Sequence, residues 1–174
     1  CKERCSLYSD MKIYLLRHAN AEPSYPDAER TLSEEGRLDV EKLGSFLCQK
    51  QSFQPEQIWI SPLVRAQETA SILHNSLSAS LKQRWTERSY DILEPERDPA
   101  PLIDLLGEVA QDILLVGHNP NLETLFSLLV SGERHRARVY LKTCVLVCLE
   151  WLPWSNNQQS GTCVLRWALD PRLL

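Results

Sequence analysis

The sequence lacks any hydrophobic run long enough to cross a membrane. Its longer apolar stretches, such as residues 113–116 and 145–149, fall far short of the roughly 20 residues that a bilayer-spanning helix needs. No apolar segment typical of a signal peptide is visible near the amino terminus. The sequence therefore predicts a protein without a membrane span, in which these runs form short buried strands.

The chain also lacks an excess of positive charge. Its 19 Lys and Arg residues stand against 23 Asp and Glu, which gives a net charge of −4 and an isoelectric point near 5.6. No overall field would therefore attract nucleic acid, and an anionic ligand would need a local basic cluster. The 174 residues, 43% of them hydrophobic, suit a globular protein. We expect residues 11–174 to form one domain and residues 1–10 to be an amino-terminal extension.

Several motifs of phosphate and metal chemistry are absent. No cysteine is followed six positions later by arginine, and neither GxxxxGK[ST] nor GxGxxG occurs. The four histidines form no HExxH pair, so we expect no metal and no other cofactor. The six cysteines are scattered, which favours a reducing, cytoplasmic setting over a disulfide framework. Cys144 and Cys148 share one face of a predicted strand and are expected to pack in the core.

Strand and helix patterns alternate along the chain. They predict strands at 12–17, 57–60, 112–116, 141–150 and 162–168, a weak strand within 81–97, and helices at about 33–49, after 61, at 99–109 and after 119. This alternation predicts an α/β protein, a three-layer α/β/α sandwich with a mainly parallel central sheet. The last two strands are expected to form a hairpin around a turn at 153–161.

Two of the predicted helices begin with the same signal. Ser61 precedes Pro62 and Asn119 precedes Pro120. Serine and asparagine are good N-caps, and proline fits the first helical position because its missing N–H group would be unpaired there. We therefore expect two helix amino termini directly after two strands.

Basic side chains stand at the carboxyl ends of three predicted strands. Arg17 and His18 follow the first strand, Arg65 lies one helical turn after the second, and His118 follows the third. Ligands of parallel sheets bind beyond the carboxyl ends of the strands. Like charges gather there mainly when an anion offsets their repulsion. The arrangement predicts a site for a compact oxyanion, of which phosphate is the best fit.

The sequence favours His18 over His118 as a nucleophile. His18 follows a strand directly, so rigid backbone holds it, and Arg17 flanks it. Neighbouring cations lower the pKa of an imidazole and keep it neutral and nucleophilic near pH 7. His118, Arg17 and Arg65 would then bind the phosphoryl group and stabilise its transition-state charge.

The segments that carry these residues resemble the histidine phosphatase superfamily. They are residues 15–21 (LLRHANA), 61–70 (SPLVRAQETA) and 116–123 (VGHNPNLE). Residues 30–36 and the compact length resemble its small SixA-type branch of phosphohistidine phosphatases. The resemblance extends from Lys12 to Leu169, with one departure, because the superfamily usually has glycine where this chain has Ala19.

This resemblance implies a phosphoglycerate-mutase-like fold and a phosphatase in which His18 forms a phosphohistidine intermediate. It also implies that Arg17, Arg65 and His118 bind the phosphoryl group. Three further residues are expected to contact the substrate: Arg30, Ser61 and Asn119.

The proton donor is open. Many members of the superfamily use a glutamate to protonate an alcohol leaving group, and Asp91, Glu94 and Glu22 are the candidates here. If none of them serves, an easier leaving group is favoured. The expected substrate is therefore phosphohistidine on a partner protein, for example a histidine phosphotransfer domain.

Two alternative functions stay open. One is a phosphatase for small-molecule phosphoesters, and the other is a non-catalytic phosphate-binding module. Neither nucleic acid nor a membrane is an expected partner. The basic loop at 133–138 is either a solvated loop or a docking site for an acidic partner.

Overall fold

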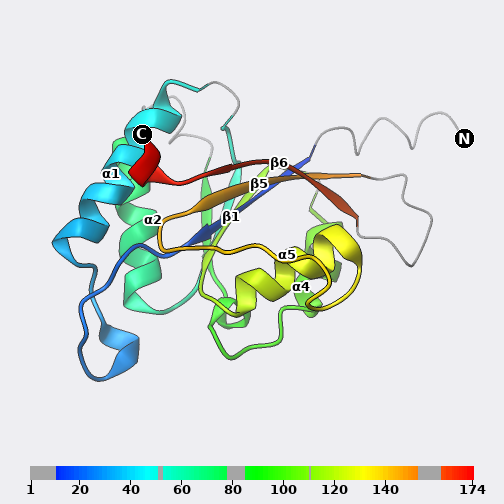
Figure 1. Ribbon diagram of the computed structural model, residues 1–174, viewed down its shortest axis with the longest axis horizontal. Helices are drawn as coiled ribbons and strands as arrows, with labels where there is room; N and C mark the ends of the chain where they lie inside the picture. Colours follow the sequence, from blue (N-terminus) through cyan, green and yellow to red (C-terminus); the bar gives the residue numbers. More distant parts are fainter. Residues whose placement is uncertain (1–10, 51–52, 78–84, 110, 153–161) are drawn as a thin grey trace, which may run out of the picture.

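The computed structural model describes residues 11–50, 53–77, 85–109, 111–152 and 162–174. Figure 1 shows a central sheet with α1 and α2 on one side and α4 and α5 on the other. These three layers confirm the predicted α/β/α sandwich. The expected extension at 1–10 and the expected turn at 153–161 lie outside the described residues.

The strands of the described chain form one six-stranded sheet in the order β3-β2-β4-β1-β5-β6. Their bounds are β1 Lys12–Arg17, β2 Gln57–Ile60, β3 Thr86–Ser89, β4 Ile113–Gly117, β5 Leu146–Trp151 and β6 Cys163–Leu169. Strands β1 to β4 are parallel to one another, whereas β5 is antiparallel to both β1 and β6. The sheet is therefore mainly parallel, and its last two strands pair as a hairpin, as predicted.

Along the sequence, the helices of the described chain connect or follow these strands. They are α1 Glu34–Cys48, α2 Val64–Ser76, α4 Pro101–Gly107 and α5 Asn121–Ser131, with short 3-10 turns η1 Asp27–Glu29, η2 Asp91–Leu93 and η3 Pro171–Leu173. Ser33 caps α1, because its hydroxyl accepts a hydrogen bond from the Gly36 N–H. Two acidic residues in the first turn favour the same helix end.

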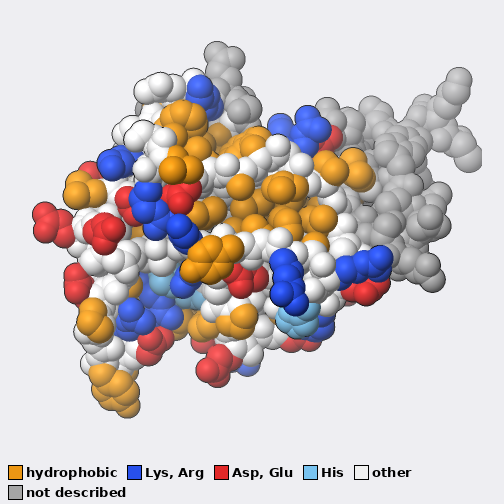
Figure 2. Space-filling model, in the orientation of Figure 1, with side chains coloured by type: hydrophobic (Ala, Val, Ile, Leu, Met, Phe, Trp, Pro, Cys, Tyr) orange, Lys and Arg blue, Asp and Glu red, His pale blue; other side chains and the backbone are white. Residues whose placement is uncertain are grey.

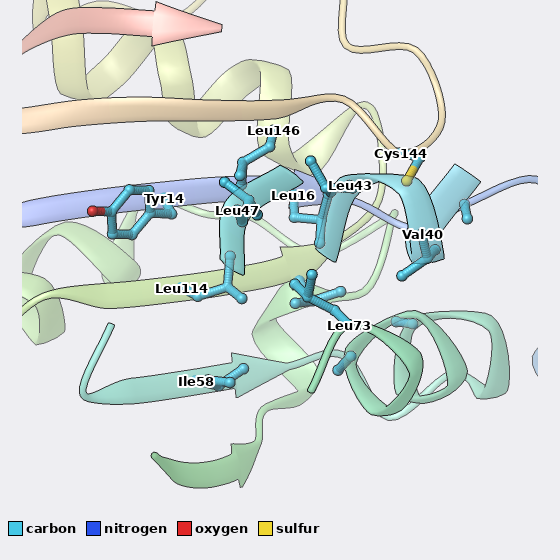
Figure 3. Close-up of a cluster of buried hydrophobic side chains, with 14 of the residues drawn as sticks. Tyr14, Leu16, Val40, Leu43, Leu47, Ile58, Leu73, Leu114, Cys144 and Leu146 are labelled. Carbon is cyan, nitrogen blue, oxygen red and sulfur yellow. The ribbon is translucent and has the colours of Figure 1, made fainter. Parts of the chain in front are cut away.

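The core has two layers because both faces of the sheet are covered. Alternate residues of β1 point to opposite faces, so Tyr14 and Leu16 lie in one hydrophobic cluster while Ile13 and Leu15 lie in the other. Figure 3 shows the first cluster, in which side chains of α1 and α2 pack on the sheet. Burial on both faces is the reason that the central strands β1 and β4 are nearly continuously apolar, whereas β3 at the edge of the sheet is polar and exposed.

Cys144 and Cys148 lie in the first cluster, as their shared face predicted. Burial raises the pKa of each thiol to about 12. Both are free cysteines. Within the described part of the chain, no group of three or more metal-binding side chains occurs. Packing therefore accounts for these two residues.

Three sequence predictions need correction at element ends. The helix after Ser61 begins at Val64 with Leu63 as its N-cap, and the helix after Asn119 begins at Asn121 with Pro120 as its N-cap. Neither residue is the N-cap. The Ser61 hydroxyl accepts from the Leu63 N–H at 3.3 Å, but Ser61 lies three residues before Val64, and the Asn119 amide bonds to Glu123 and Leu141 instead. The strand predicted at 141–150 begins only at Leu146, because Leu141 bonds to the side chains of Arg17 and Glu123 instead of a neighbouring strand.

None of the helices in the described ranges is long and apolar enough to span a bilayer.

Candidate active site

The carboxyl ends of β1 and β4 bring His18 and His118 together. The two strands are parallel neighbours, and Arg17 lies opposite Gly117 in their register. The histidines that follow have ring centroids 4.8 Å apart, and both are buried, with 8% and 1% of their surface exposed. Figure 2 shows histidine side chains among Lys and Arg side chains at this end of β1. Adjacent strands thus place the two imidazoles in contact.

His18 is held as a neutral ring with one defined tautomer. Its Nδ1 lies 2.7 Å from the carbonyl oxygen of Ala19, which can only accept, so Nδ1 carries the proton and Nε2 keeps a free lone pair. The pKa of His18 is lowered to about 4, chiefly by burial and also by the charges of Arg65, Arg17 and Arg30, against the opposing effect of the Ala19 hydrogen bond. The imidazole is therefore nucleophilic at Nε2 near neutral pH.

His118 is also neutral in this arrangement. Its Nε2 lies 2.8 Å from the Ser61 hydroxyl, at the carboxyl end of β2. Burial lowers its pKa to about 3, and the neighbouring His18 and Arg65 act in the same direction. The same hydroxyl also accepts from the Leu63 N–H at 3.3 Å, so Ser61 links His118 to the residue before α2. A bound anion would reverse the balance and favour the protonated ring.

Arg17 is fixed by the backbone of the segment between α5 and β5. Its guanidinium donates to the Leu141 carbonyl oxygen at 2.8 Å, and the Asn119 amide donates to the same oxygen at 2.9 Å. The Glu123 carboxylate accepts from Asn119 at 2.7 Å and from the Leu141 N–H at 3.1 Å. Burial lowers the pKa of Arg17, and the Glu123 charge opposes this effect. Asn119 therefore serves this network rather than a helix end.

Arg65 comes from the first turn of α2 and is 4% exposed. It donates to the backbone oxygen of Asp27 at 2.8 Å and to the Asp27 carboxylate at 3.1 Å. The Thr69 hydroxyl, one turn later, donates to the Arg65 carbonyl oxygen and accepts from the Ala19 N–H. Thr69 thus ties α2 to the backbone just after His18.

Arg30 joins the same side of the site. It donates to the backbone oxygens of Ala21 and Glu22 and to the Asp27 carboxylate, and its charge acts on His18. Asp27 therefore bridges Arg30 and Arg65 with its two carboxylate oxygens. These hydrogen bonds, above all the one from Arg30, hold the pKa of Asp27 below its usual range.

Several buried polar atoms of the site have no hydrogen-bond partner within the described chain. They are Nε of Arg17, Nε of Arg65, Nδ1 of His118 and Oδ1 of Asn119. Buried polar groups without partners are uncommon and costly. Two of these four are guanidinium donors beside His18, so a guest rich in acceptor oxygens fits the site chemically.

The three candidate proton donors differ in exposure and in what surrounds them. Glu22 and Asp91 are exposed, and within the described ranges neither forms a hydrogen bond or ion pair with His18 or His118. Glu94 is half-buried and lies 3.9 Å from Arg97. With Asp27 and Leu63 it lines an open groove of about 450 Å³. Of the three, Glu94 alone shares a groove with a residue bonded to Arg65.

The sequence interpretation missed Asp27, Thr69 and Glu123. Asp27 lies three residues before Arg30, and Glu123 lies four after Asn119. Both spacings are typical of local side-chain pairs and could have suggested these contacts. The bond from Thr69 to the Ala19 N–H joins segments 50 residues apart, and no local signal predicts it.

The family model of the histidine phosphatase superfamily (branch 1) matches residues 13–100. The chain therefore belongs to the histidine phosphatase superfamily. A comparison with curated proteins gave no match.

Solved structures show the same fold at low sequence identity. The protein histidine phosphatase SixA complexed with tungstate is 22% identical with a TM-score of 0.73, and the match covers 94% of this chain and 99% of that one. The SixA protein from Agrobacterium tumefaciens is 23% identical with a TM-score of 0.72, covering 91% and 97%. A mycobacterial glucosyl-3-phosphoglycerate phosphatase with VO3 is 17% identical with a TM-score of 0.64, covering 90% and 98%. These likenesses confirm the phosphoglycerate-mutase-like fold.

Proposed function

We propose that this protein is a phosphatase that removes the phosphoryl group from phosphohistidine on a partner protein. The observation that carries the proposal is the pairing of a neutral His18, with its lone pair on Nε2, and guanidinium donors that lack protein partners. Membership in the histidine phosphatase superfamily supports phosphatase chemistry. Two similar folds were solved with tungstate or VO3, oxyanions of the kind that this donor set suits.

The proposed reaction has two steps. His18 Nε2 attacks phosphorus, a new N–P bond forms, and the bond from phosphorus to the substrate's imidazole breaks. That imidazole leaves as a neutral ring when its other nitrogen is protonated. Water then attacks the phosphorus on His18, releases inorganic phosphate and returns the ring electrons to Nε2. Arg17, Arg65 and a protonated His118 would stabilise the negative charge of the transferring group in both steps.

The surroundings of His18 support an easy leaving group. An alcohol leaves poorly without an acid to protonate it, and neither Glu22 nor Asp91 forms a hydrogen bond or ion pair with the histidines in the described chain. A protonated imidazole needs no such residue. The SixA protein with the similar fold is named a protein histidine phosphatase, which favours the same substrate class.

Hydrolysis of small phosphoesters is the alternative, and the groove shared by Glu94 and Asp27 favours it. A substrate panel with EDTA present separates the two: a phosphohistidine-bearing protein, p-nitrophenyl phosphate and sugar phosphates. We expect the phosphohistidine protein to be hydrolysed with the highest kcat/KM. A preference for alkyl phosphates would contradict the proposal and indicate an acid at the site. Binding without turnover would indicate a phosphate-binding module.

A further inference from the structure

We propose that Arg138, Tyr140 and Lys142 form a docking strip that receives an acidic surface of the phosphorylated partner. This inference rests on the proposed function and adds the kind of protein surface that the enzyme recognises. The strip lies on residues 137–142, the segment that connects α5 to β5 beside the site (Figure 1).

The strip faces outward because the segment alternates. Leu141 is fully buried, and Val139 and Ala137 pack partly against the core beneath α5. Arg138, Tyr140 and Lys142 are exposed, and Tyr140 has 76% of its surface accessible. An extended segment sends alternate side chains to opposite sides. The backbone therefore presents two cations with an aromatic side chain between them.

The two cations of the strip are unpaired, unlike their neighbours in the chain. Arg134 pairs with Asp98 at 2.6 Å, and Arg136 pairs with Glu133. Arg138 and Lys142 form no ion pair or side-chain hydrogen bond with any described residue. The charge of Lys142 acts on Asp170 without forming an ion pair with it, and both cations of the strip are exposed to an incoming protein. The whole chain has a net charge of −4, whereas this strip is positively charged. It would therefore attract acidic groups.

The strip lies directly beside the proposed catalytic residues. The Leu141 carbonyl oxygen, between Tyr140 and Lys142, accepts the Arg17 hydrogen bond, and Tyr140 is close enough to Arg17 to influence its pKa. Figure 2 shows Lys and Arg side chains over this segment on the same face as the histidines at the end of β1. A protein whose phosphohistidine enters the site would therefore lie against the strip.

A groove of about 300 Å³ extends this surface. Arg138, Val139 and Ala137 line it from the strip side, and Pro120 and Thr124 line it from the start of α5. Glu123, which bonds to Asn119 and Leu141, also lines it, so the groove adjoins the network that holds Arg17 and suits a partner side chain near the phosphohistidine. Exposed tyrosine and arginine are common anchors in protein interfaces. Aromatic area, cationic charge and a neighbouring groove together fit an acidic protein surface.

The test compares two synthetic phosphohistidine peptides of equal length, one with glutamates and one with glutamines around the phosphohistidine. At low salt we expect wild-type kcat/KM to be about tenfold higher for the acidic peptide, and added salt to reduce this ratio. In the Arg138→Gln, Lys142→Gln double variant the ratio should fall close to one, while kcat/KM for the neutral peptide stays unchanged.

The matched control removes two exposed cations elsewhere, with Lys42→Gln on α1 and Arg88→Gln on β3. It should keep the wild-type ratio. Equal hydrolysis of both peptides by the wild type, or equal loss of preference in the control, would overturn the docking strip and leave the proposed function standing. Hydrolysis of neither peptide would overturn the proposed function, and the strip with it.

Discussion

Glu123 supports the site indirectly, through the residues that it holds in place. Its carboxylate holds both the Asn119 amide and the Leu141 N–H, and the Leu141 carbonyl in turn orients Arg17. Glu123 thus acts on the site through two other residues. In the proposed reaction it is a positioning residue, because it touches neither nucleophile nor substrate.

Replacement of Glu123 should weaken phosphoryl binding through Arg17. We expect Glu123→Ala to lower kcat/KM by about 10-fold to 100-fold, in part through a higher KM. The reason is that a small displacement of the Arg17 guanidinium weakens its interaction with the phosphoryl group. Glu123→Gln keeps an acceptor oxygen and should retain more activity. Steady-state kinetics on one substrate measure both, with Glu133→Gln as a surface control that loses the same charge. Equal loss in the alanine and glutamine variants would contradict the positioning role.

Asp27 is an exposed carboxylate bound to Arg65, a proposed phosphoryl ligand, and to Arg30, an expected substrate contact. A phosphoryl group that approaches Arg65 and Arg30 meets this negative charge. Asp27→Asn removes the charge, while Arg65 keeps its bond to the Asp27 backbone oxygen at 2.8 Å. We therefore expect tungstate to bind a few-fold more tightly to the variant, measured by calorimetry.

The control for Asp27 is Asp98→Asn, an exposed aspartate paired with Arg134. It should leave the tungstate affinity unchanged. Weaker tungstate binding by Asp27→Asn would mean that the carboxylate positions Arg65 rather than competing with the ligand.

At the scale of elements, the start of α1 sets the position of the chain just after His18, the proposed nucleophile. Gly36, in the first turn of α1, approaches the backbone of Asn20 so closely that a Cβ would lie 2.1 Å from the Asn20 carbonyl oxygen. The Ser33 N–H also donates to that oxygen at 2.9 Å. The helix and the segment after β1 therefore fit only with glycine at this position.

Gly36→Ala should destabilise the protein by about 1–3 kcal/mol, as overpacking of a tight contact does. It should also lower activity, since the displaced segment follows His18. Gly107→Ala, at the end of α4, is the matched control because nothing lies within 4 Å of its added Cβ. Urea unfolding of the three proteins measures the effect. Equal stability of the two variants would refute the close approach as the cause.

The sequence predicts elements better than it predicts element ends. The strands at 12–17 and 57–60 and the helix at about 33–49 are confirmed, because the period of apolar residues is a local property. The caps at Ser61 and Asn119 are wrong for different reasons. Ser61 lies three residues before α2, where its hydroxyl bonds to His118 and to the Leu63 N–H, whereas Leu141 and Glu123 engage the Asn119 amide.

The convergence of the site could be predicted, but its supporting contacts could not. Strand ends in a parallel sheet meet at one edge, so the meeting of His18 with His118 follows from topology. The order of strands places β4 directly beside β1, which the sequence does not state. The bridge that Asp27 makes between Arg65 and Arg30 depends on how η1 lies against α2, which only the folded chain shows.

For the whole molecule, two buried neutral histidines couple stability to pH. The pKa of His18 is lowered to about 4 and that of His118 to about 3, from 6.5 in the unfolded chain. Below pH 6.5 the unfolded state therefore binds more protons than the folded state, so stability present above pH 6.5 is lost as the pH falls toward 4. The loss should be on the order of a few kcal/mol.

Urea unfolding at pH 7 and pH 5 measures this loss. The His18→Gln, His118→Gln double variant cannot titrate at these positions, and its stability should change less than that of the wild type over the same interval. Parallel profiles for the two proteins would show that the histidines do not titrate as described.

The most direct measurement of the central claim is capture of a phosphoryl group on His18 during turnover. The protein is mixed with a phosphohistidine peptide labelled in its phosphoryl group, quenched with base within the first turnovers, and digested. We predict a base-stable, acid-labile label on the peptide that contains His18, no label in His18→Ala, and a loss of activity on the order of 10³-fold or more in that variant. Label on another residue, or full activity of His18→Ala, would contradict the account.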